Sequence, residues 1–193
     1  MGKIIPFSVS RRESKLDLNT LLKRAVELRD KVVNSRDDLK KSLIIASSPA
    51  EFRIWVSGLI SEAIFKHPSL ISSETFLCGS YSSSVLTECL FGSPRSWWAI
   101  DYLKKFFESK DQKKRATALK KGGDLCFLIC SVFPERANVR AMRLADYRNI
   151  GIGFYQRHFS FAGAEISNHM SERFSPMAAI IRDHVLANLR WVR

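Results

Sequence analysis

Residues 122–155, GGDLCFLICSVFPERANVRAMRLADYRNIGIGFY, contain the pattern on which the fold depends. An acid, Asp124, precedes an apolar run that breaks at Pro134. After an arginine-rich connector, a second apolar pattern with helical spacing starts near Asp146. Proline lacks the backbone donor that a helix needs and ends the helix before it. The stretch therefore predicts two helices that face each other across a proline-broken corner.

The same stretch resembles the signature of a family of uncharacterised bacterial helical proteins. That signature combines Gly-Asp, an aliphatic-aromatic helix, a Phe-Phe-Pro-Glu corner, and Asp-Tyr-Tyr with a nearby glycine and a further tyrosine. The matching residues here are Gly123-Asp124, Phe133-Pro134-Glu135, Asp146-Tyr147 and Gly151, with Tyr155 a candidate for the last tyrosine. Val132 and Arg148 stand where the signature has Phe and Tyr. The resemblance covers residues 115–190 and implies a helical fold, but no activity.

Most of the remaining chain also has apolar residues at steps of three and four, as a helix requires. The pattern predicts helices over 17–33 and 36–46, over 144–161 and 162–174, and from Ser175 onward. Ser48-Pro49-Ala50-Glu51 is typical of a helix start. No segment alternates polar and apolar residues in the way of a strand. We expect an all-α, single-domain bundle of about eight helices.

Two regions have a weaker pattern. Residues 1–14 are short, basic and interrupted by Pro6, which predicts a flexible N-terminal arm before a helical domain over 15–193. Residues 69–92 are rich in serine, and we expect only a short helix near 82–91, ended by Gly92. A serine-rich linker, with a subdivision of the domain near 67–93, is the alternative.

The lysine-rich segment before the central stretch has two further features of interest. Asp111 is expected to cap a helix that continues through this segment into the apolar run. Gly122 and Gly123 then lie inside the helix, where they either kink it or admit a close neighbour. Trp97-Trp98 could form a stacking platform for bases, but packing at the edge of the core is the expected role.

Charge is the strongest indication of function. The chain has a formal net charge of +12, which suits association with nucleic acid or an acidic protein. Residues 104–121 contain seven Lys and one Arg against two acids, whereas residues 135–193 contain nine Arg and no Lys. We therefore predict a nucleic-acid-binding or acidic-protein-binding surface, and its candidate residues are Lys104, Lys105, Lys113, Lys114, Arg115, Lys120 and Lys121. A solvated surface without a partner remains the alternative.

A second candidate site is the polar corner of the central stretch. Its proposed ligand-binding residues are Asp124, Glu135, Arg136, Tyr147 and Arg148. These side chains either converge on one pocket, or simply occupy helix ends and ion pairs, as acids near helix termini commonly do. Convergence of Asp124, Glu135 and Tyr147 at one point would favour a pocket.

Other classes of function lack their motifs. The cysteines Cys78, Cys89, Cys126 and Cys130 include no C-x-x-C pair, which argues against a zinc knuckle and favours reduced thiols in the cytoplasm. The scattered histidines form no convincing metal site, and no nucleophile or phosphate-loop motif is present. No apolar stretch approaches the roughly 20 residues that span a bilayer.

From these observations we expect a cytoplasmic helical protein that binds or regulates an anionic partner, with no catalytic residues, cofactor or metal. An enzyme or small-molecule binder at the polar corner, and a structural subunit of a complex, are the alternatives. Exposed Trp98, Phe107 or Trp191 in one apolar patch would favour a structural subunit. The sequence also leaves open whether the chain forms a homo-oligomer.

Overall fold

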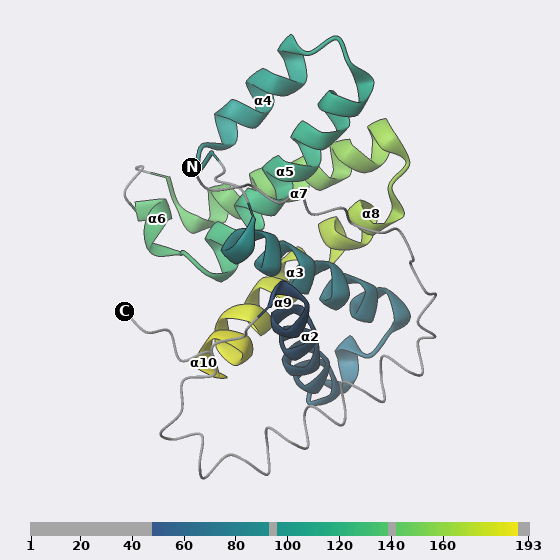
Figure 1. The fold of residues 1–193 in the computed structure, drawn as a ribbon, viewed down its shortest axis with the longest axis vertical. Helices are drawn as coiled ribbons and strands as arrows, with labels where there is room; N and C mark the ends of the chain where they lie inside the picture. Colours follow the sequence, from purple (N-terminus) through teal and green to yellow (C-terminus); the bar gives the residue numbers. More distant parts are fainter. Residues whose placement is uncertain (1–47, 93–95, 139–141, 189–193) are drawn as a thin grey trace, which may run out of the picture.

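A computed structural model describes residues 48–92, 96–138 and 142–188 of the 193-residue chain. Helices account for 85% of these residues, and the described part contains no strand (Figure 1). The expected all-α fold of about eight helices is therefore confirmed. The predictions for the arm at 1–14 and for helices at 17–33 and 36–46 concern residues outside the described ranges. Within those ranges, no helix is long and apolar enough to cross a membrane.

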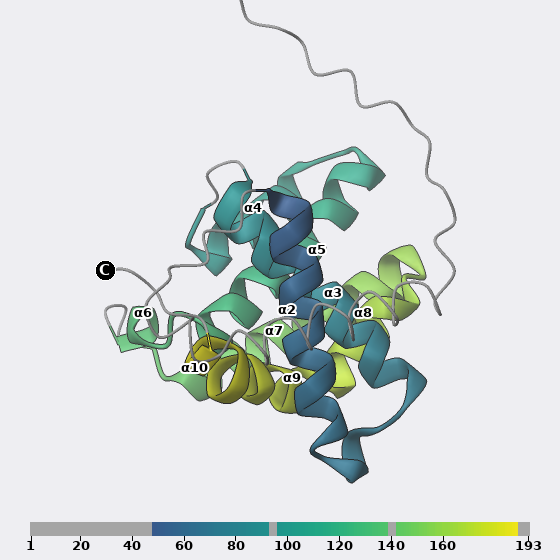
Figure 2. The same ribbon diagram turned by 60° about the horizontal axis from the view of Figure 1, so that its bottom comes forward.

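Helices α2 (Pro49–Phe65) and α3 (Ser73–Phe91) form an antiparallel pair joined by a short 3-10 turn, η1 (Pro68–Leu70). As predicted, Ser48 caps α2, and its hydroxyl accepts a hydrogen bond from the backbone N–H of Glu51 at 3.2 Å. The C-terminal elements α9 (Phe174–Ile180) and η2 (Ile181–Val185) pack against α2 (Figure 2). In Figure 1, α3 crosses the middle of the molecule, and most of α2 lies below it, on the side opposite α4 (Ala99–Glu108).

Helix α3 corrects the prediction of a short helix near 82–91. It is 19 residues long and includes the serine cluster, and several of the hydroxyls bond back to carbonyls of the preceding turn. The Ser83 and Thr87 hydroxyls donate to the carbonyls of Ser80 and Ser83, each at 2.7 Å. Ser57 of α2 also donates to the Ser83 hydroxyl at 2.8 Å. Small serine side chains therefore allow α2 and α3 to approach closely and remain paired.

The next two helices, α4 (Ala99–Glu108) and α5 (Gln112–Ser131), form a second hairpin. Asp111 caps α5 as predicted, and its carboxylate accepts from the backbone N–H groups of Lys113 and Lys114 at 2.8 and 3.2 Å. Before α4, Trp97 packs its ring edge-on against Phe133, with the centroids 5.2 Å apart. Trp98 is 53% exposed, so the tandem tryptophans lie at the edge of the core, as expected.

Helices α5 and α7 (Leu144–Ala162) form the central pair of the fold, and the short α6 (Glu135–Asn138) lies in the connection between them. Helix α5 ends at Ser131, before Pro134, and the side chain of Asp146 accepts a hydrogen bond from the backbone N–H of Arg143 at 2.9 Å. Two helices joined across a corner are therefore present, as the central stretch predicts. Residues 125–129 of α5 are completely buried, which places this helix at the centre of the core.

The glycines of α5 permit a close approach of α7. Helix α5 is continuous through Gly122 and Gly123, so the alternative of a close neighbour is the correct one. A Cβ atom on Gly122 would lie 2.5 Å from the Phe154 ring, and one on Gly123 would lie 2.8 Å from the Tyr155 ring. Both contacts are shorter than non-bonded carbon atoms tolerate. The two glycines thus bring the aromatic side chains of α7 against the backbone of α5.

The C-terminal helices divide as predicted. Helix α7 ends at Ala162 and is followed by Gly163, whose φ of 64° is left-handed, and α8 (Glu165–Glu172) is the helix expected over 162–174, shorter at both ends. Helix α9 (Phe174–Ile180) starts one residue before the predicted Ser175 and continues through the π-helical turn η2 (Ile181–Val185) into α10 (Leu186–Asn188).

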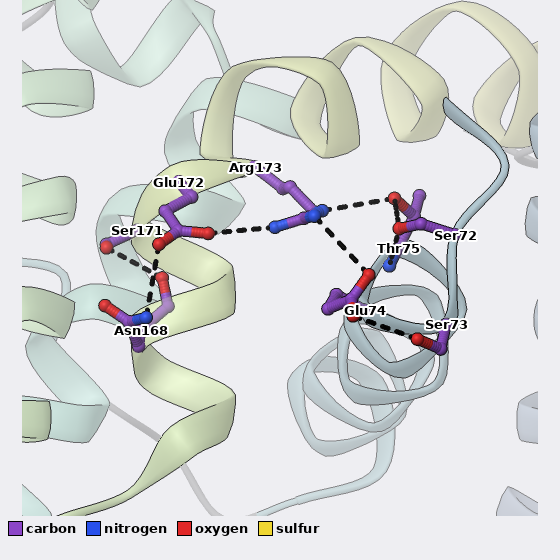
Figure 3. Close-up of polar contacts among 8 residues, drawn as sticks. All are labelled: Ser72, Ser73, Glu74, Thr75, Asn168, Ser171, Glu172 and Arg173. Carbon is purple, nitrogen blue, oxygen red and sulfur yellow. Dashed lines mark hydrogen bonds and ion pairs between the residues drawn. The ribbon is translucent and has the colours of Figure 1, made fainter. Parts of the chain in front are cut away.

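Arg173, between α8 and α9, joins this region to the start of α3 (Figure 3). Its guanidinium group donates to the Thr75 hydroxyl at 3.2 Å and lies 3.0 and 3.6 Å from the carboxylates of Glu172 and Glu74. This network connects the end of α8 to the start of α3.

Candidate functional site

The most unusual polar group in the core is the carboxylate of Asp124, whose residue is only 2% exposed. One of its oxygens, Oδ1, accepts hydrogen bonds from the hydroxyls of Tyr81 and Tyr155 at 2.6 and 2.8 Å. The other oxygen, Oδ2, lies 2.9 Å from Nζ of Lys120. We refer to these four residues as the Asp124 cluster. An isolated buried charge would be strongly unfavourable, but this one has an ammonium partner and two further donors.

Three helices supply the cluster. Lys120 and Asp124 are four residues apart on α5 and therefore share one face of it. Tyr81 comes from α3 and Tyr155 from α7. The Tyr155 ring can reach the carboxylate because its neighbour on α5, Gly123, has no side chain. The cluster thus links the α2–α3 pair to the central α5–α7 pair.

The electrostatics keep the tyrosines protonated. Burial, followed by the negative charge of Asp124, raises the pKa of Tyr81 well above its ordinary value, and the same causes raise the pKa of Tyr155. Both hydroxyls are therefore donors to the carboxylate. The Lys120 ammonium also lies 5.0 Å from the centroid of the Tyr81 ring, in a cation–π arrangement.

A histidine lies close to the cluster. His158 of α7 is 8% exposed, and its Nδ1 lies 2.6 Å from the hydroxyl of Ser167 on α8. Burial, and next the positive charge of Lys120, lower the pKa of His158. The folded protein therefore favours the neutral imidazole, which bonds α7 to α8. Because these polar groups already satisfy one another inside the core, their arrangement fits a structural network better than a reactive site.

The remaining residues of the predicted polar corner lie elsewhere. Glu135 is exposed in the first turn of α6, and Arg148 is exposed on α7. Arg136 stacks over the Trp97 ring, 4.1 Å from its centroid. Tyr147 is buried at 2% exposure in the first turn of α7. In the described part of the chain, the hydrogen bonds of Asp124 go to α3, α5 and α7, and none goes to these four residues.

Most residues of the predicted basic surface face solvent. The exposed lysines of the α4–α5 hairpin are Lys104, Lys105, Lys110, Lys113, Lys114 and Lys121, and we refer to these six as the basic surface. None of them forms an ion pair with a carboxylate within the ranges that the structure covers. One of them, Lys105, lies 5.4 Å from the centroid of the buried Tyr102 ring, in a cation–π arrangement.

The other two predicted cations point inward. Lys120 belongs to the Asp124 cluster. Arg115 lies between the rings of Phe106 and Phe161, with its guanidinium carbon 4.5 and 4.9 Å from their centroids. Its position suits cation–π packing between α4, α5 and α7. The structure thus divides the predicted set into five outward lysines and two cations that hold the helices together.

Beside the basic surface, a groove of about 440 Å³ opens between α4, α5 and α7. Leu119 and Phe154 are buried residues of its lining, Leu103 and Ile150 are half-buried, and Gly153 and Arg157 are exposed. A second depression, of about 320 Å³, lies beside α3 and α8 and is lined by Tyr81, Glu165 and His169 among others. The Tyr81 hydroxyl at this second depression is already bonded to Asp124.

The sequence singles out Asp124 as an unusual acid, but not its partners. Its counter-ion is Lys120, at the four-residue spacing of a helical ion pair. The spacing was visible in the sequence. Tyr81 is 43 residues from Asp124, so no local pattern could identify it.

The chain has no significant match among protein-family models, curated proteins or solved structures. The likeness of residues 115–190 to a helical family therefore stays a resemblance.

Proposed function

We propose that this protein is a binding module that contacts an anionic macromolecule through the basic surface of the α4–α5 hairpin. The observation that carries the proposal is the contrast in pairing. Six lysines of one hairpin are exposed and have no ion pair in the described part of the chain, whereas the inward Lys120 pairs with a buried acid. Exposed charges without an internal counter-ion are available to a partner.

The arrangement of the lysines suits a broad anionic surface. At about 100° per residue, Lys113, Lys114 and Lys121 fall within about 100° of one another around α5. Lys104 and Lys105 extend the surface onto α4. Lysine contacts an anion through one flexible ammonium group, whereas arginine presents a planar guanidinium group with several donors. The surface therefore favours binding through backbone or surface charge, with a strong dependence on salt.

The test is a binding titration with fluorescent single-stranded RNA and with an acidic polypeptide such as poly-glutamate, each at low and at near-physiological salt. The variant Lys113→Gln/Lys114→Gln/Lys121→Gln removes three outward charges. The control Arg53→Gln/Lys66→Gln/Arg182→Gln removes three exposed charges outside this hairpin, and two of these, Lys66 and Arg182, pair with Glu62 and Asp183. We expect the first variant to bind more weakly than the control. Equal affinities for the two variants, or no binding of either probe at low salt, would contradict the proposal.

A further inference from the structure

Helix α4 exposes an aromatic ring near its C-terminal end. Phe107 is 68% exposed, more than any other large apolar side chain in the described residues. Its ring packs against that of Phe106, with the centroids 5.1 Å apart and the ring planes inclined at 72°. Phe106 is itself held by the Phe161 ring and the Arg115 guanidinium group. The exposed ring therefore rests on a fixed support, and much of its surface is open to a flat partner group.

The groove between α4, α5 and α7 begins one turn before this ring. Leu103, four residues before Phe107 on α4, belongs to its lining. From α7 the groove is lined by three exposed polar residues, Gln156, Arg157 and Ser160. Their amide, guanidinium and hydroxyl groups all donate hydrogen bonds, and the amide and the hydroxyl also accept them. The accessible lining beside the exposed ring is therefore mainly polar.

The charged residues of α4 are divided around the helix axis. At about 100° per residue, Lys104 lies about 60° from Phe107. Glu108 and Asp101 lie about 100° and 120° from Phe107, beyond Lys104 and on the side away from the groove. Asp101 also accepts a hydrogen bond from the Ser96 hydroxyl. A ligand that covers the ring and the groove therefore meets cations before either acid.

The combination of an open ring, polar groups and cations fits an unpaired nucleotide better than an acidic polypeptide. A base has a flat face that stacks on an aromatic side chain and an edge that forms hydrogen bonds, and its phosphate is negatively charged. The side chains of glutamate and aspartate provide charge without such a face. In a duplex the faces of the bases are covered by their neighbours, so the ring would have no partner there.

We propose that the partner of the α4–α5 hairpin is a single-stranded nucleic acid, one base of which stacks on the Phe107 ring. Lys104 and Lys110, three residues before and after this ring, contact the flanking phosphates, and the neighbouring nucleotide lies along the groove at Arg157. The proposal rests on the proposed function, since the same hairpin carries the basic surface. It narrows the anionic macromolecule to a strand with unpaired bases, which RNA and DNA both provide.

The experiment compares probes with the same number of phosphates at low salt. They are a single-stranded RNA, a single-stranded DNA, an abasic DNA strand and a DNA duplex of half the length, with poly-glutamate as an anion without bases. Each is titrated with the full chain and with Phe107→Leu, which removes the ring but keeps an apolar side chain. Phe107→Trp keeps an aromatic face.

The control Phe65→Leu makes the same change at a phenylalanine that is 59% exposed at the end of α2. Thermal unfolding of each variant verifies that it is folded. We expect Phe107→Leu to bind single strands with bases at least about fivefold more weakly, the low end of what base–aromatic stacking contributes. Phe107→Trp and Phe65→Leu should retain the affinity. The unmodified protein should prefer strands with bases to the abasic strand and to the duplex.

Unchanged affinity of a folded Phe107→Leu protein for single strands would overturn the inference, as would equal binding of the abasic strand or of the duplex. Binding of only one of the two single strands, with the expected loss in Phe107→Leu, supports it and identifies the sugar that is recognised. If only poly-glutamate binds, and the lysine substitutions weaken it, the inference fails but the proposed function stands. If none of the probes binds at low salt, both fail.

Discussion

The first half of helix α5 exposes Lys113 and Lys114 to solvent, whereas in its second half residues 125–129 are completely buried. The boundary lies at the neighbouring residues Lys120 and Lys121. Lys120 pairs with the buried Asp124, and Lys121 is exposed on the basic surface. One helix thus contains charge that the fold uses and charge that it leaves available. A count of basic residues cannot separate the two, but their partners can.

Asp124→Ala, in the buried half of α5, should lower the free energy of unfolding most strongly. The substitution removes the acceptor of both tyrosine hydroxyls and leaves Lys120 without its counter-ion. Loss of one partner from a buried ion pair typically destabilises by about 3–5 kcal/mol. We expect a loss near the lower end of that range in denaturant unfolding. Glu108→Ala, at an exposed acid of α4, is the control and should change the free energy by less than about 0.5 kcal/mol. Equal losses of unfolding free energy in the two variants would show that the buried acid contributes no more to stability than an exposed one.

Alanine substitutions at Gly123 and Gly153 should change the free energy of unfolding in opposite directions. Gly123→Ala places a Cβ atom 2.8 Å from the Tyr155 ring, so we expect a loss of about 1–3 kcal/mol from overpacking. Gly153→Ala meets no neighbour and should stabilise the helix by up to about 1 kcal/mol. Chemical denaturation of the two variants in parallel measures both effects. Stabilisation by Gly123→Ala would show that α5 and α7 are not held this closely.

His158 makes the buried region sensitive to acid. Its pKa is lowered in the folded protein by burial and then by Lys120, so folding favours the neutral imidazole. The associated stability is complete above the ordinary histidine pKa of about 6.5 and is lost as the pH falls through the folded pKa. His158→Gln should therefore make the free energy of unfolding depend less on pH between about 7 and 5. His184, whose pKa burial also lowers, will leave some dependence. An unchanged slope would exclude the expected role of His158.

Substitutions in the exposed half of α5 should have the smallest effect on stability. Lys113→Gln/Lys114→Gln/Lys121→Gln alters side chains without ion pairs in the described structure. We expect the free energy of unfolding to stay within about 0.5 kcal/mol of the unmodified protein. The same variant is expected to lose affinity for anionic probes, so stability and binding separate. A clear destabilisation would place these lysines in the structural network instead.

Local patterns in the sequence were sufficient for the all-α class and for several helix boundaries. Ser48 and Asp111 cap their helices by accepting from backbone groups two or three residues away. Pro134 also lies only a few residues after the end of α5. The helical period likewise identified the long helix after residue 144. Such features depend on neighbours in the chain and can be read directly from it.

The errors arose where distant contacts decide the outcome. Serine in residues 80–84 appeared to weaken a helix, but packing of α3 on α2 and bonds within α3 outweigh its low propensity. The candidate site was only partly recognisable for the same reason. Asp124 stood out as an acid in an apolar run, yet Tyr81 and Tyr155 meet it only when three helices assemble. The groove at Gly153 likewise depends on the packing of α4 against α5 and α7.

The most direct test compares Lys120→Gln with Lys121→Gln, two identical changes at adjacent positions. Each variant is measured twice, by denaturant unfolding and by titration with an anionic probe at low salt. Because Lys120 is partly exposed, we expect its loss to destabilise the protein by about 1–3 kcal/mol, below the largest values for a broken buried pair. Lys121→Gln should leave stability unchanged and weaken binding. Equal stability of the two variants, or weaker binding by Lys120→Gln alone, would contradict the division of α5 into a structural half and a binding half.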